Sequence, residues 1–353
     1  MAKFSDVLTI INGKNQAKVE NSDGKYPIYG SGGIMGRADD YLCNAETVVI
    51  GRKGSINKPI FVEEPFWNVD TAFGLVANRE KLLPKYLFYF CVYFDFEKLN
   101  TTVTIPSLTK TNLLEIEMDL PELGKQKQIV NELTKVDDLI SLRKQQLAKL
   151  DELIKARFVE LFDEWNSNPE PLKSFLKDIT YGFTNPMPDA EEGPWKVTAK
   201  DVVNGKVNYD TARKTTVQAF EELTAKSKPT VGDVLLTKDG TLGRCAVVEE
   251  DGICVNQSVA VLKCNEKILP KFLAILLQMP EYQREMLKNA GGGTIKHIYI
   301  TKVVDMLIVV PTISQQMEFL SFVEQTDKSK MAIQQSLDKL ETLKKSLMQK
   351  YFG

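Results

Sequence analysis

Hydrophobic residues recur along two long segments of the chain at alternating intervals of four and three, which is the spacing of a coiled-coil helix. The first stripe runs from residue 129 to residue 161 and the second, displaced by 190 residues, from 319 to 351. Each stripe is longer than one small domain can cover, so we expect the two helices to pack against each other. Independent surface helices are the alternative. The residues expected to pair the helices are Ile129, Leu133, Val136, Ile140, Leu147, Leu150 and Ile154 in the first and Phe319, Val323, Ile333, Leu337, Leu340 and Leu347 in the second.

Cationic residues interrupt each stripe at places where the other stripe continues. Arg143 aligns with Ile333, and Lys330 aligns with Ile140. Polar residues at such positions can set the register of a coiled coil and discourage self-pairing.

The segments before the long helices contain short β-branched runs closed by glycine turns, a pattern typical of strands. These runs lie at 26–33, 47–50, 231–237 and 244–248. In each half a proline then opens a short helix, expected from Pro84 to about Leu99 and from Pro270 to about Lys288. A last strand follows, expected at Glu115 to Leu120 and at Val304 to Val310.

The order of these parts is the same in both halves because the chain repeats itself. Leu83-Pro-Lys-Tyr-Leu recurs as Leu269-Pro-Lys-Phe-Leu, and Leu120-Pro121 recurs as Val310-Pro311. A period this long indicates a duplicated domain and excludes a solenoid. We therefore predict an α+β fold of two mixed globules, separated by two long antiparallel helices that form a coiled coil with pseudo-two-fold symmetry. The expected boundaries are 1–124 and 164–313 for the globules and 125–163 and 314–353 for the helices.

Composition narrows the chemistry of the chain. The 353 residues are 43% hydrophobic and 26% charged, as expected for a globular protein of about two domains. The single histidine, His297, and five cysteines without a C-x-x-C pair exclude zinc-finger sites and H-E-x-x-H proteases. Cys245, Cys254 and Cys264 lie in strand-like runs and are expected to be core residues. The N-terminal segment predicts no signal peptide and no run is long enough to span a membrane, so we expect a cytoplasmic protein.

Catalytic motifs are missing from the sequence. It contains no P-loop, and the run from Gly30 to Gly36 departs from the dinucleotide-binding fingerprint by one spacing. The run Asn185-Pro-Met-Pro resembles a methyltransferase signature but lacks the adjacent prolines and the aromatic residue, which favours a turn. His297 has no evident serine or carboxylate partner, so a catalytic role is not expected.

Three polar loops recur in both halves and are candidates for DNA contacts. Residues 51–55 align with 237–241, residues 69–71 with 255–258, and residues 100–105 with 291–297. Basic side chains can reach guanine, amides can bind adenine, and glycine next to a hydroxyl allows close approach to phosphate. For any one loop a solvated turn remains the alternative. The candidate DNA-binding residues are Arg52, Lys53, Ser55, Asp70, Thr71, Thr102, Thr104, Lys238, Thr241, Asn256, Gln257, Thr294 and Lys296.

A proline–glutamine run leads into each long helix. Leu120-Pro121 precedes Gln126 and Val310-Pro311 precedes Gln316, and the helices contain the matching runs Lys149-Leu-Asp-Glu-Leu and Lys339-Leu-Glu-Thr-Leu. With these features the whole chain resembles the specificity (S) subunits of type I restriction-modification systems. One departure is Asn-Thr-Thr-Val-Thr in the first copy, where the second has the more typical Gly-Gly-Gly-Thr-Ile-Lys.

The resemblance implies that each globule is a target-recognition domain that reads half of a split double-stranded DNA site. The long helices would be spacers that dock two methyltransferase subunits. The resemblance leaves open whether restriction/translocase subunits also join the complex. The chain would not be an enzyme itself and would bind no cofactor, because S-adenosylmethionine, ATP and Mg²⁺ would be used by the partner subunits for adenine-N6 methylation and DNA cleavage. Because the loop residues differ between the copies, we expect an asymmetric target.

Two other classes remain open at this point. One is a coiled-coil adaptor with two protein-binding heads, which the pI near 5.8 and the net charge of −2 would suit. The other is a stand-alone modification enzyme.

Overall fold

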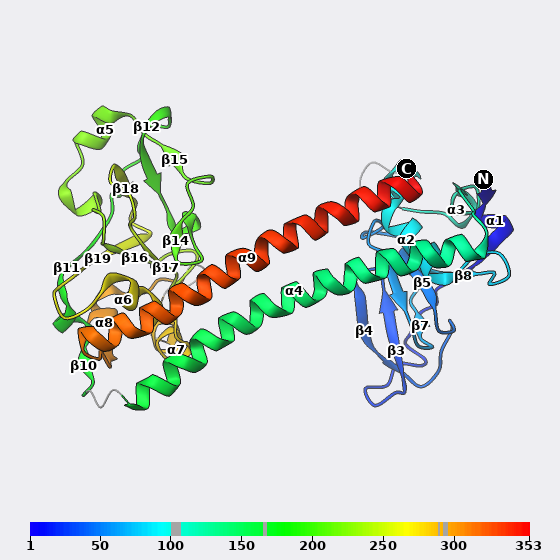
Figure 1. The fold of residues 1–353 in the computed structure, drawn as a ribbon. Helices are drawn as coiled ribbons and strands as arrows, with labels where there is room; N and C mark the ends of the chain where they lie inside the picture. The colour runs from blue at the N-terminus through cyan, green and yellow to red at the C-terminus, as the bar shows by residue number, and fades with distance from the viewer. Residues whose placement is uncertain (100–106, 165–167, 289, 292–295) are drawn as a thin grey trace. The chain divides into compact units, whose positions relative to one another are not determined.

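The computed structural model describes residues 1–99, 107–164, 168–288, 290–291 and 296–353. It forms two compact units, of which unit 1 comprises Met1–Leu147 with Ala332–Gly353 and unit 2 comprises Ala148–Met331. The long helices α4 (Leu123–Glu164) and α9 (Ile313–Phe352) each begin in one unit and end in the other (Figure 1). Each unit therefore contains part of both helices. The expected division into globules and separate helices stays a prediction.

Unit 1 is built from a four-stranded sheet of order β2-β8-β5-β6 and a three-stranded sheet of order β4-β3-β7. A short pair, β1 with β9, lies beside them. Apart from α4 and α9, its elements are β1 (Ala2–Lys3), α1 (Phe4–Val7), β2 (Leu8–Asn12), β3 (Tyr26–Gly30), β4 (Gly33–Ala38), β5 (Thr47–Gly51), β6 (Ile60–Val62), β7 (Trp67–Asn68), β8 (Ala72–Ala77), α2 (Pro84–Tyr93), the 3₁₀ helix η1 (Phe96–Leu99), α3 (Lys110–Leu114) and β9 (Glu117–Met118).

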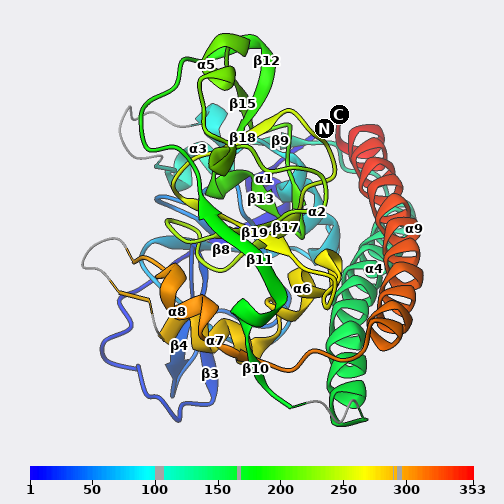
Figure 2. The same ribbon diagram turned by 90° about the vertical axis from the view of Figure 1, so that its left-hand side faces the viewer.

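Unit 2 repeats this arrangement, with a four-stranded sheet β11-β19-β16-β17, a three-stranded sheet β15-β12-β18, and the pair β10 with β20. Its elements are β10 (Glu170–Pro171), η2 (Leu172–Phe175), β11 (Leu176–Tyr181), β12 (Ala190–Val197), η3 (Ala199–Asp201), β13 (Val202–Val203), β14 (Lys206–Val207), β15 (Arg213–Lys214), α5 (Val217–Glu221), η4 (Ala225–Ser227), β16 (Val234–Thr237), β17 (Cys245–Val247), β18 (Ile253–Val255), β19 (Val259–Cys264), α6 (Pro270–Leu276), α7 (Pro280–Lys288), α8 (Ile300–Val304) and β20 (Leu307–Ile308). Figure 2 shows α6, which packs against β16 and β17.

The two units share details of strand pairing as well as strand order. In unit 1 β3 pairs with β7 in parallel, and in unit 2 β12 pairs with β18 in parallel, while the strands of the larger sheets are antiparallel. The duplicated α+β fold expected from the sequence repeat is confirmed.

A buried glutamine explains the proline–glutamine run before α4. The Gln126 side chain accepts a hydrogen bond from the Leu83 N–H at 2.8 Å, and its amide donates to the carbonyls of Lys81 and Pro121, both at 2.8 Å. It thereby joins the start of the long helix to the turn before α2. Gln316 makes the same three bonds in unit 2, with Leu269, Lys267 and Pro311 at 2.8, 2.9 and 2.8 Å.

Both long helices contribute to the hydrophobic core of each unit. In unit 1 Leu133 of α4 and Met348 of α9 are buried in one cluster, and the Phe352 ring lies 5.2 Å from the ring of Tyr86. In unit 2 Phe158 of α4 and Phe319 of α9 are fully buried and in edge-to-face contact, with ring centroids 5.7 Å apart. The folded part of each unit thus depends on two helix segments that are far apart in the sequence.

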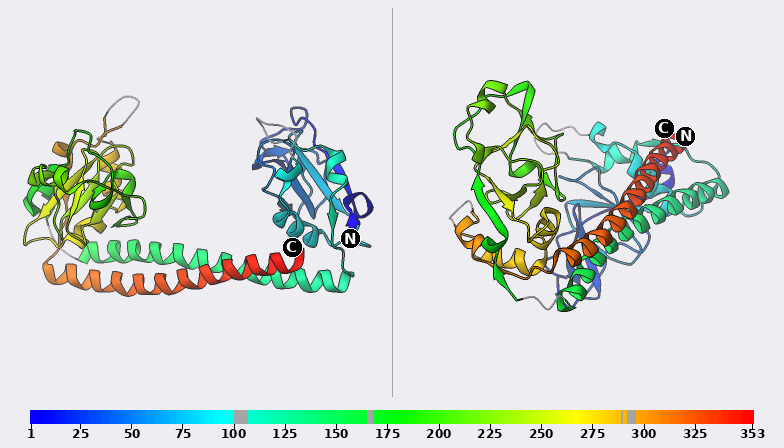
Figure 3. Two further views of the ribbon diagram at one scale, coloured as in Figure 1. Left: turned by 90° about the horizontal axis from the view of Figure 1, so that it is seen from above. Right: turned by 60° about the vertical axis from the view of Figure 1, so that its left-hand side comes forward.

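The helices pack side by side and antiparallel within each unit (Figure 3), which confirms the expected pairing. Lys344 binds Asp137 at 2.6 Å in unit 1, and Lys330 binds Asp151 at 2.6 Å in unit 2. Lys330, the cationic interruption of the second stripe, is therefore paired across to α4, and so is Lys344 of the same helix. Of the residues expected to pair the helices, Ile129, Leu133, Val136, Phe319, Val323 and Leu337 are buried, and Ile140, Leu147, Leu150, Ile154, Ile333, Leu340 and Leu347 are half-buried.

Several elements are shorter than the sequence pattern predicts. Helix α2 ends at Tyr93, and the helix expected from Pro270 to about Lys288 is two helices, because Pro280 lacks an N–H to continue α6 and instead begins α7. The last strands contain only two residues each, since β9 and β20 pair with strands of two residues.

Candidate nucleic-acid interface

Three segments that are distant in sequence meet in unit 1 at the end of β5. The Arg52 N–H donates to the Thr71 carbonyl at 2.8 Å, and the Leu108 N–H donates to the Arg52 carbonyl at 2.9 Å. The backbone at Arg52 is therefore held from both sides. Its side chain is exposed, with the guanidinium 5.8 Å from the centre of the Phe73 ring. A cation fixed in this way can form a directed contact with a base edge or a phosphate.

Unit 2 assembles the same junction from the equivalent segments. The Lys238 N–H donates to the Ser258 carbonyl at 2.8 Å, and the Ile298 N–H donates to the Lys238 carbonyl at 2.8 Å. We call these two arrangements the unit 1 junction (Arg52, Thr71 and Leu108) and the unit 2 junction (Lys238, Ser258 and Ile298). The first two loops that the sequence repeat aligned are brought together in both units, next to the residue that follows the third loop; residues 100–105 and 292–295 of the third loop lie outside the described residues.

A glycine-rich turn completes the unit 1 junction. A Cβ atom at Gly51 would lie 2.5 Å from the Ser55 carbonyl oxygen and 3.0 Å from the Ser31 Cβ, so only glycine fits. Ser31 belongs to the turn between β3 and β4, in the run that failed the dinucleotide fingerprint. Beyond the turn, Ile34 and Met35 are exposed on β4, where the strand pairing shifts register.

The candidate DNA-binding residues differ in accessibility. Asn256 is tied into its own turn, because its side-chain oxygen accepts hydrogen bonds from the Ser258 hydroxyl and N–H at 2.5 and 3.2 Å. This leaves Gln257 as the better placed amide, and every assignment in this set stays a prediction. Exposed members of the set are Arg52, Lys53, Asp70, Thr71, Gln257 and Lys296; half-buried members are Ser55, Lys238, Thr241 and Asn256; and Thr102, Thr104 and Thr294 lie outside the described residues.

The unit 2 junction also contains polar groups that the sequence did not single out. The Asp239 carboxylate bonds to the Lys238 ammonium at 2.8 Å and to the His297 Nδ1 at 2.5 Å. The sequence gives no evident carboxylate partner for His297, and the structure supplies one that lies 58 positions away in the sequence. The Lys238 ammonium also lies 5.8 Å from the centre of the exposed Tyr181 ring.

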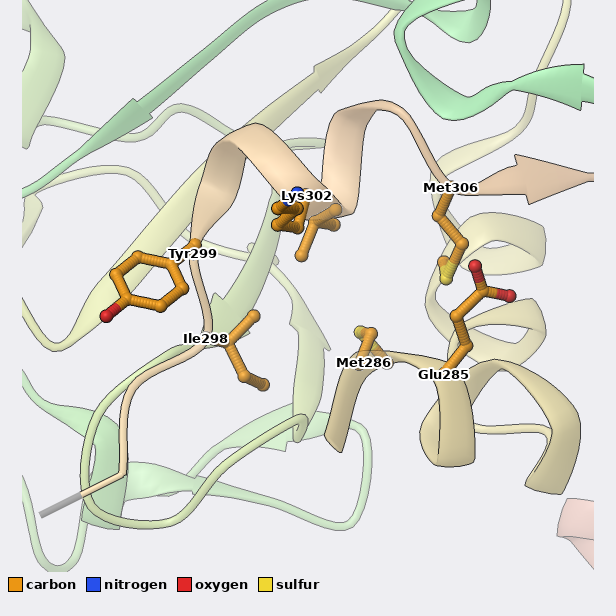
Figure 4. A pocket seen from close by; sticks show the side chains of 7 residues that line it. Glu285, Met286, Ile298, Tyr299, Lys302 and Met306 are labelled. Carbon is orange, nitrogen blue, oxygen red and sulfur yellow. The ribbon is translucent and has the colours of Figure 1, made fainter. Parts of the chain in front are cut away.

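Two hollows lie near this junction. A groove of about 480 Å³ is lined by Tyr181, Phe183, Asn185 and Lys226, among others. A cavity of about 10 Å³ lies between α7 and the segment around α8, and Figure 4 shows Met286 and Met306 among its lining side chains. The cavity has room for about one water molecule, so it is too small for a substrate.

The cysteines are core residues, as the strand pattern predicts. Cys245 and Cys254 are buried and Cys264 is half-buried. Burial raises the pKa of the Cys245 and Cys264 thiols to about 12 and that of Cys254 to about 11, so the nucleophilic thiolate is scarce at neutral pH.

Within the described part of the chain, no three metal-ligating side chains gather into a possible ion site. No helix in these ranges combines the length and apolar character needed to cross a membrane.

Sequence comparison identifies relatives of the whole chain. A family model described as the type I restriction modification DNA specificity domain matches residues 1–152 and 172–344. The type I restriction enzyme EcoBI specificity subunit of Escherichia coli is 23% identical over 354 residues, covering 89% of this chain and 74% of the relative. A putative type I restriction enzyme specificity subunit of Haemophilus influenzae is 24% identical, with 98% and 94% covered.

Solved structures share the fold. The S subunit of a type I restriction-modification system from M. genitalium has a TM-score of 0.59 at 15% identity, covering 100% of this chain and 95% of that chain. A chain from a study of complex assembly and conformational transition in the type I R-M system has a TM-score of 0.62 at 16% identity, with 99% and 96% covered.

Proposed function

Because the chain belongs to the type I restriction-modification DNA specificity family, we propose that it reads a double-stranded DNA target in two different half-sites, one with each unit. In this role it is the specificity subunit of a larger enzyme and performs no chemistry itself. Adenine-N6 methylation would be carried out by two methyltransferase subunits with S-adenosylmethionine. Restriction/translocase subunits, where present, would use ATP and Mg²⁺.

One observation carries the proposal of two half-sites. The junctions share two backbone hydrogen bonds whose lengths agree within 0.1 Å, yet they present Arg52 and Lys53 in unit 1 and Lys238 and Asp239 in unit 2. The two junctions thus share backbone hydrogen bonds and differ in their charged side chains. This arrangement suits two readers of different sequences, because base identity is read by side chains at groove edges.

Mapping of methylated adenines in cells that express this chain with its methyltransferase tests the proposal. Single-molecule sequencing of the genome should return one motif with two unlike parts separated by unspecified bases. Expression of the methyltransferase alone is the control and should leave the motif unmethylated. A short continuous motif, or two identical half-sites, would contradict the two-reader proposal, and no methylated motif together with no binding to duplex DNA would favour a protein-binding adaptor.

Exposed hydrophobic side chains on the long helices support docking of partner subunits. Leu139 and Leu142 are 42% and 47% exposed on α4 in unit 1, and Met317 and Met331 are 61% and 64% exposed on α9 in unit 2. Contiguous exposed apolar patches commonly mark protein interfaces, and Leu139 and Leu142 are neighbours on one face of α4. Replacement of Leu139 and Leu142 with serine should weaken co-purification of the methyltransferase, whereas replacement of the exposed Lys345 with serine should not.

The spacing role of the helices can be tested by insertion. One heptad added to both α4 and α9 preserves the seam, since the pattern repeats every seven residues. We expect both half-sites to be retained while the number of bases between them changes or methylation is lost. An altered half-site sequence would contradict the spacing role.

A further inference from the structure

The single histidine of the chain, His297, directly precedes Ile298 of the unit 2 junction. The His297 N–H donates to the Gly291 carbonyl at 2.7 Å, and the Gly291 N–H donates to the His297 carbonyl at 3.0 Å. The following residue, Ile298, is bonded to Lys238. The backbone around His297 is thus fixed without help from its side chain, which is 44% exposed.

Asp239 determines which nitrogen of the imidazole carries the proton. The Nδ1 atom of His297 lies 2.5 Å from Oδ1 of Asp239. An ionised carboxylate only accepts hydrogen bonds, so Nδ1 must donate. In the neutral ring the other nitrogen, Nε2, then has a free lone pair and is an acceptor.

Both oxygens of Asp239 are occupied, since Oδ2 accepts from the Lys238 ammonium at 2.8 Å. Asp239 is only 18% exposed and is therefore a positioning residue, not a base contact. It places a donor, Lys238, next to an acceptor, His297. Other ionisable residues close to His297 in the sequence are the exposed Lys296 and Tyr299, whose ring lies against Gly291.

We propose that His297 is a specificity-determining residue of unit 2, which accepts a hydrogen bond from an exocyclic amino group of a base in its half-site. The proposal rests on the DNA-reading function inferred above. In the major groove the donors are adenine N6 and cytosine N4, so a neutral Nε2 acceptor selects one of these. Protonation turns Nε2 into a donor, which faces the amino group unfavourably and adds charge that favours any DNA.

Unit 1 lacks this pair and provides an internal comparison. The bridge between Asp239 and His297 corresponds to the bridge between Lys53 and Ser107. Lys53 and Ser107 carry no imidazole ring. Neither side chain can therefore change from a hydrogen-bond acceptor to a donor by ring protonation. Base selection by unit 2 should therefore weaken when Nε2 takes up a proton, while selection by unit 1 should not.

The tautomer can be measured on the full chain without DNA. Because there is only one histidine, ¹⁵N-histidine labelling gives a single set of ring resonances. Long-range ¹H–¹⁵N spectra at pH 8 should report the Nδ1–H tautomer, and Asp239→Asn should change the tautomer ratio. A dominant Nε2–H form in the wild-type chain would overturn the proposal.

Base contact is tested with duplexes that lack one amino group. In the mapped unit 2 half-site, purine replaces adenine or 2-pyrimidinone replaces cytosine, one position at a time. At one position the wild-type chain should lose about tenfold in affinity beyond the loss shown by His297→Ala, the size expected for one specific base contact. If removal of an amino group lowers the affinity of the wild-type chain and of His297→Ala equally at every position, His297 does not read an amino group.

The pH dependence gives a second readout. Between pH 8 and pH 5.5 the ratio of affinities for the target and for a duplex with a scrambled unit 2 half-site should fall about tenfold. His297→Gln, which keeps an acceptor oxygen but does not titrate, should retain the ratio at both pH values. Glu285→Gln, an exposed change on α7, should behave as wild type. A ratio that is constant with pH in the wild-type chain would overturn the proposal.

These outcomes distinguish a failure of the His297 proposal from a failure of the DNA-reading function on which it rests. If the wild-type chain binds its target selectively but His297→Ala has the same selectivity, only the role of His297 fails. If the wild-type chain shows no selectivity for any duplex, the DNA-reading function fails and the base contact fails with it. A rise in affinity for all duplexes on acidification, at a constant ratio, would identify a phosphate contact and contradict base reading.

Discussion

The two junctions have the same backbone bonds and different side-chain chemistry. In unit 1 the exposed Arg52 and Lys53 both add positive charge, whereas in unit 2 Asp239 accepts hydrogen bonds from Lys238 and His297. A shared frame therefore fixes where the loops lie and leaves the side chains to determine what they bind. The buried glutamines show the opposite behaviour, since Gln126 and Gln316 repeat every contact. The difference separates positions that build the unit from positions that read a ligand.

The largest effect is expected from removal of a buried helix residue in each unit. This change tests whether both long helices contribute to the core of both units. Phe319→Ala should lower the free energy of unfolding by about 3–5 kcal/mol and Leu133→Ala by about 2–5 kcal/mol, because both side chains are fully buried and leave cavities. Denaturant unfolding followed by circular dichroism measures the change. Met331→Ala, which is 64% exposed, should stay within about 0.5 kcal/mol. An equal loss for all three variants would mean that the helices do not belong to the cores.

The glutamine contacts predict matched losses in the two units. Gln126→Met and Gln316→Met each leave one N–H and two carbonyls without their partner, at an expected cost of about 2–4 kcal/mol. Since the bond lengths agree within 0.1 Å, we expect the two losses to agree within about 1 kcal/mol. Chemical denaturation of each variant gives the values, and the exposed Gln325→Met serves as the control. Losses of unfolding free energy that differ several-fold would show that the two units differ in energetics although their hydrogen-bond lengths agree.

The DNA contacts should distinguish the units. Arg52→Ala and Lys238→Ala should each weaken target binding by about 1–3 kcal/mol and relax base preference in different half-sites. Fluorescence anisotropy with target duplexes altered in one half-site measures both effects, with the exposed Lys345→Ala on α9 as the control. If the side chain contacts a phosphate, its removal should instead weaken binding to all sequences alike. The slope of log affinity against log salt concentration should then fall by about one. Relaxation of the same half-site by both variants would contradict one reader per unit.

The smallest effects are expected from the ion pairs between the helices. Lys344→Ala in unit 1 and Lys330→Ala in unit 2 should each cost about 0.2–1 kcal/mol, because the pairs remain partly exposed to water. Unfolding measured at low salt and at about 1 M salt should show a smaller loss at high salt, where the charges are screened. A loss above about 2 kcal/mol in either variant would mean that the lysine contributes packing as well as charge.

The duplicated fold was predictable because it depends on periodic patterns and on short motifs that recur in both halves. The heptad spacing around Leu133 and Val323 identifies the helix pair irrespective of the rest of the fold. The repeat also aligned the loops at Arg52 and Lys238. The break between α6 and α7 was missed because the apolar pattern continues through it, although Pro280 marks the place.

The polar pair in unit 2 could not have been found from the sequence. Asp239 and His297 are 58 residues apart, and their contact depends on how the end of β16 meets the segment before α8. The repeat gives no signal either, because the equivalent positions in unit 1 are Lys53 and Ser107. Such a pair is specific to one copy, so a comparison of the copies does not reveal it.

The discontinuous sequence of unit 1 has a consequence for biosynthesis. Unit 2 is continuous from Ala148 to Met331, whereas unit 1 also needs Ala332–Gly353 to complete its core. On a ribosome that adds about 5–20 residues per second, the wait between Leu147 and Gly353 lasts about 10–40 s. The unit that begins the chain is therefore the last to be completed, and until then the nascent protein exposes the apolar surface that Met348 and Phe352 will cover.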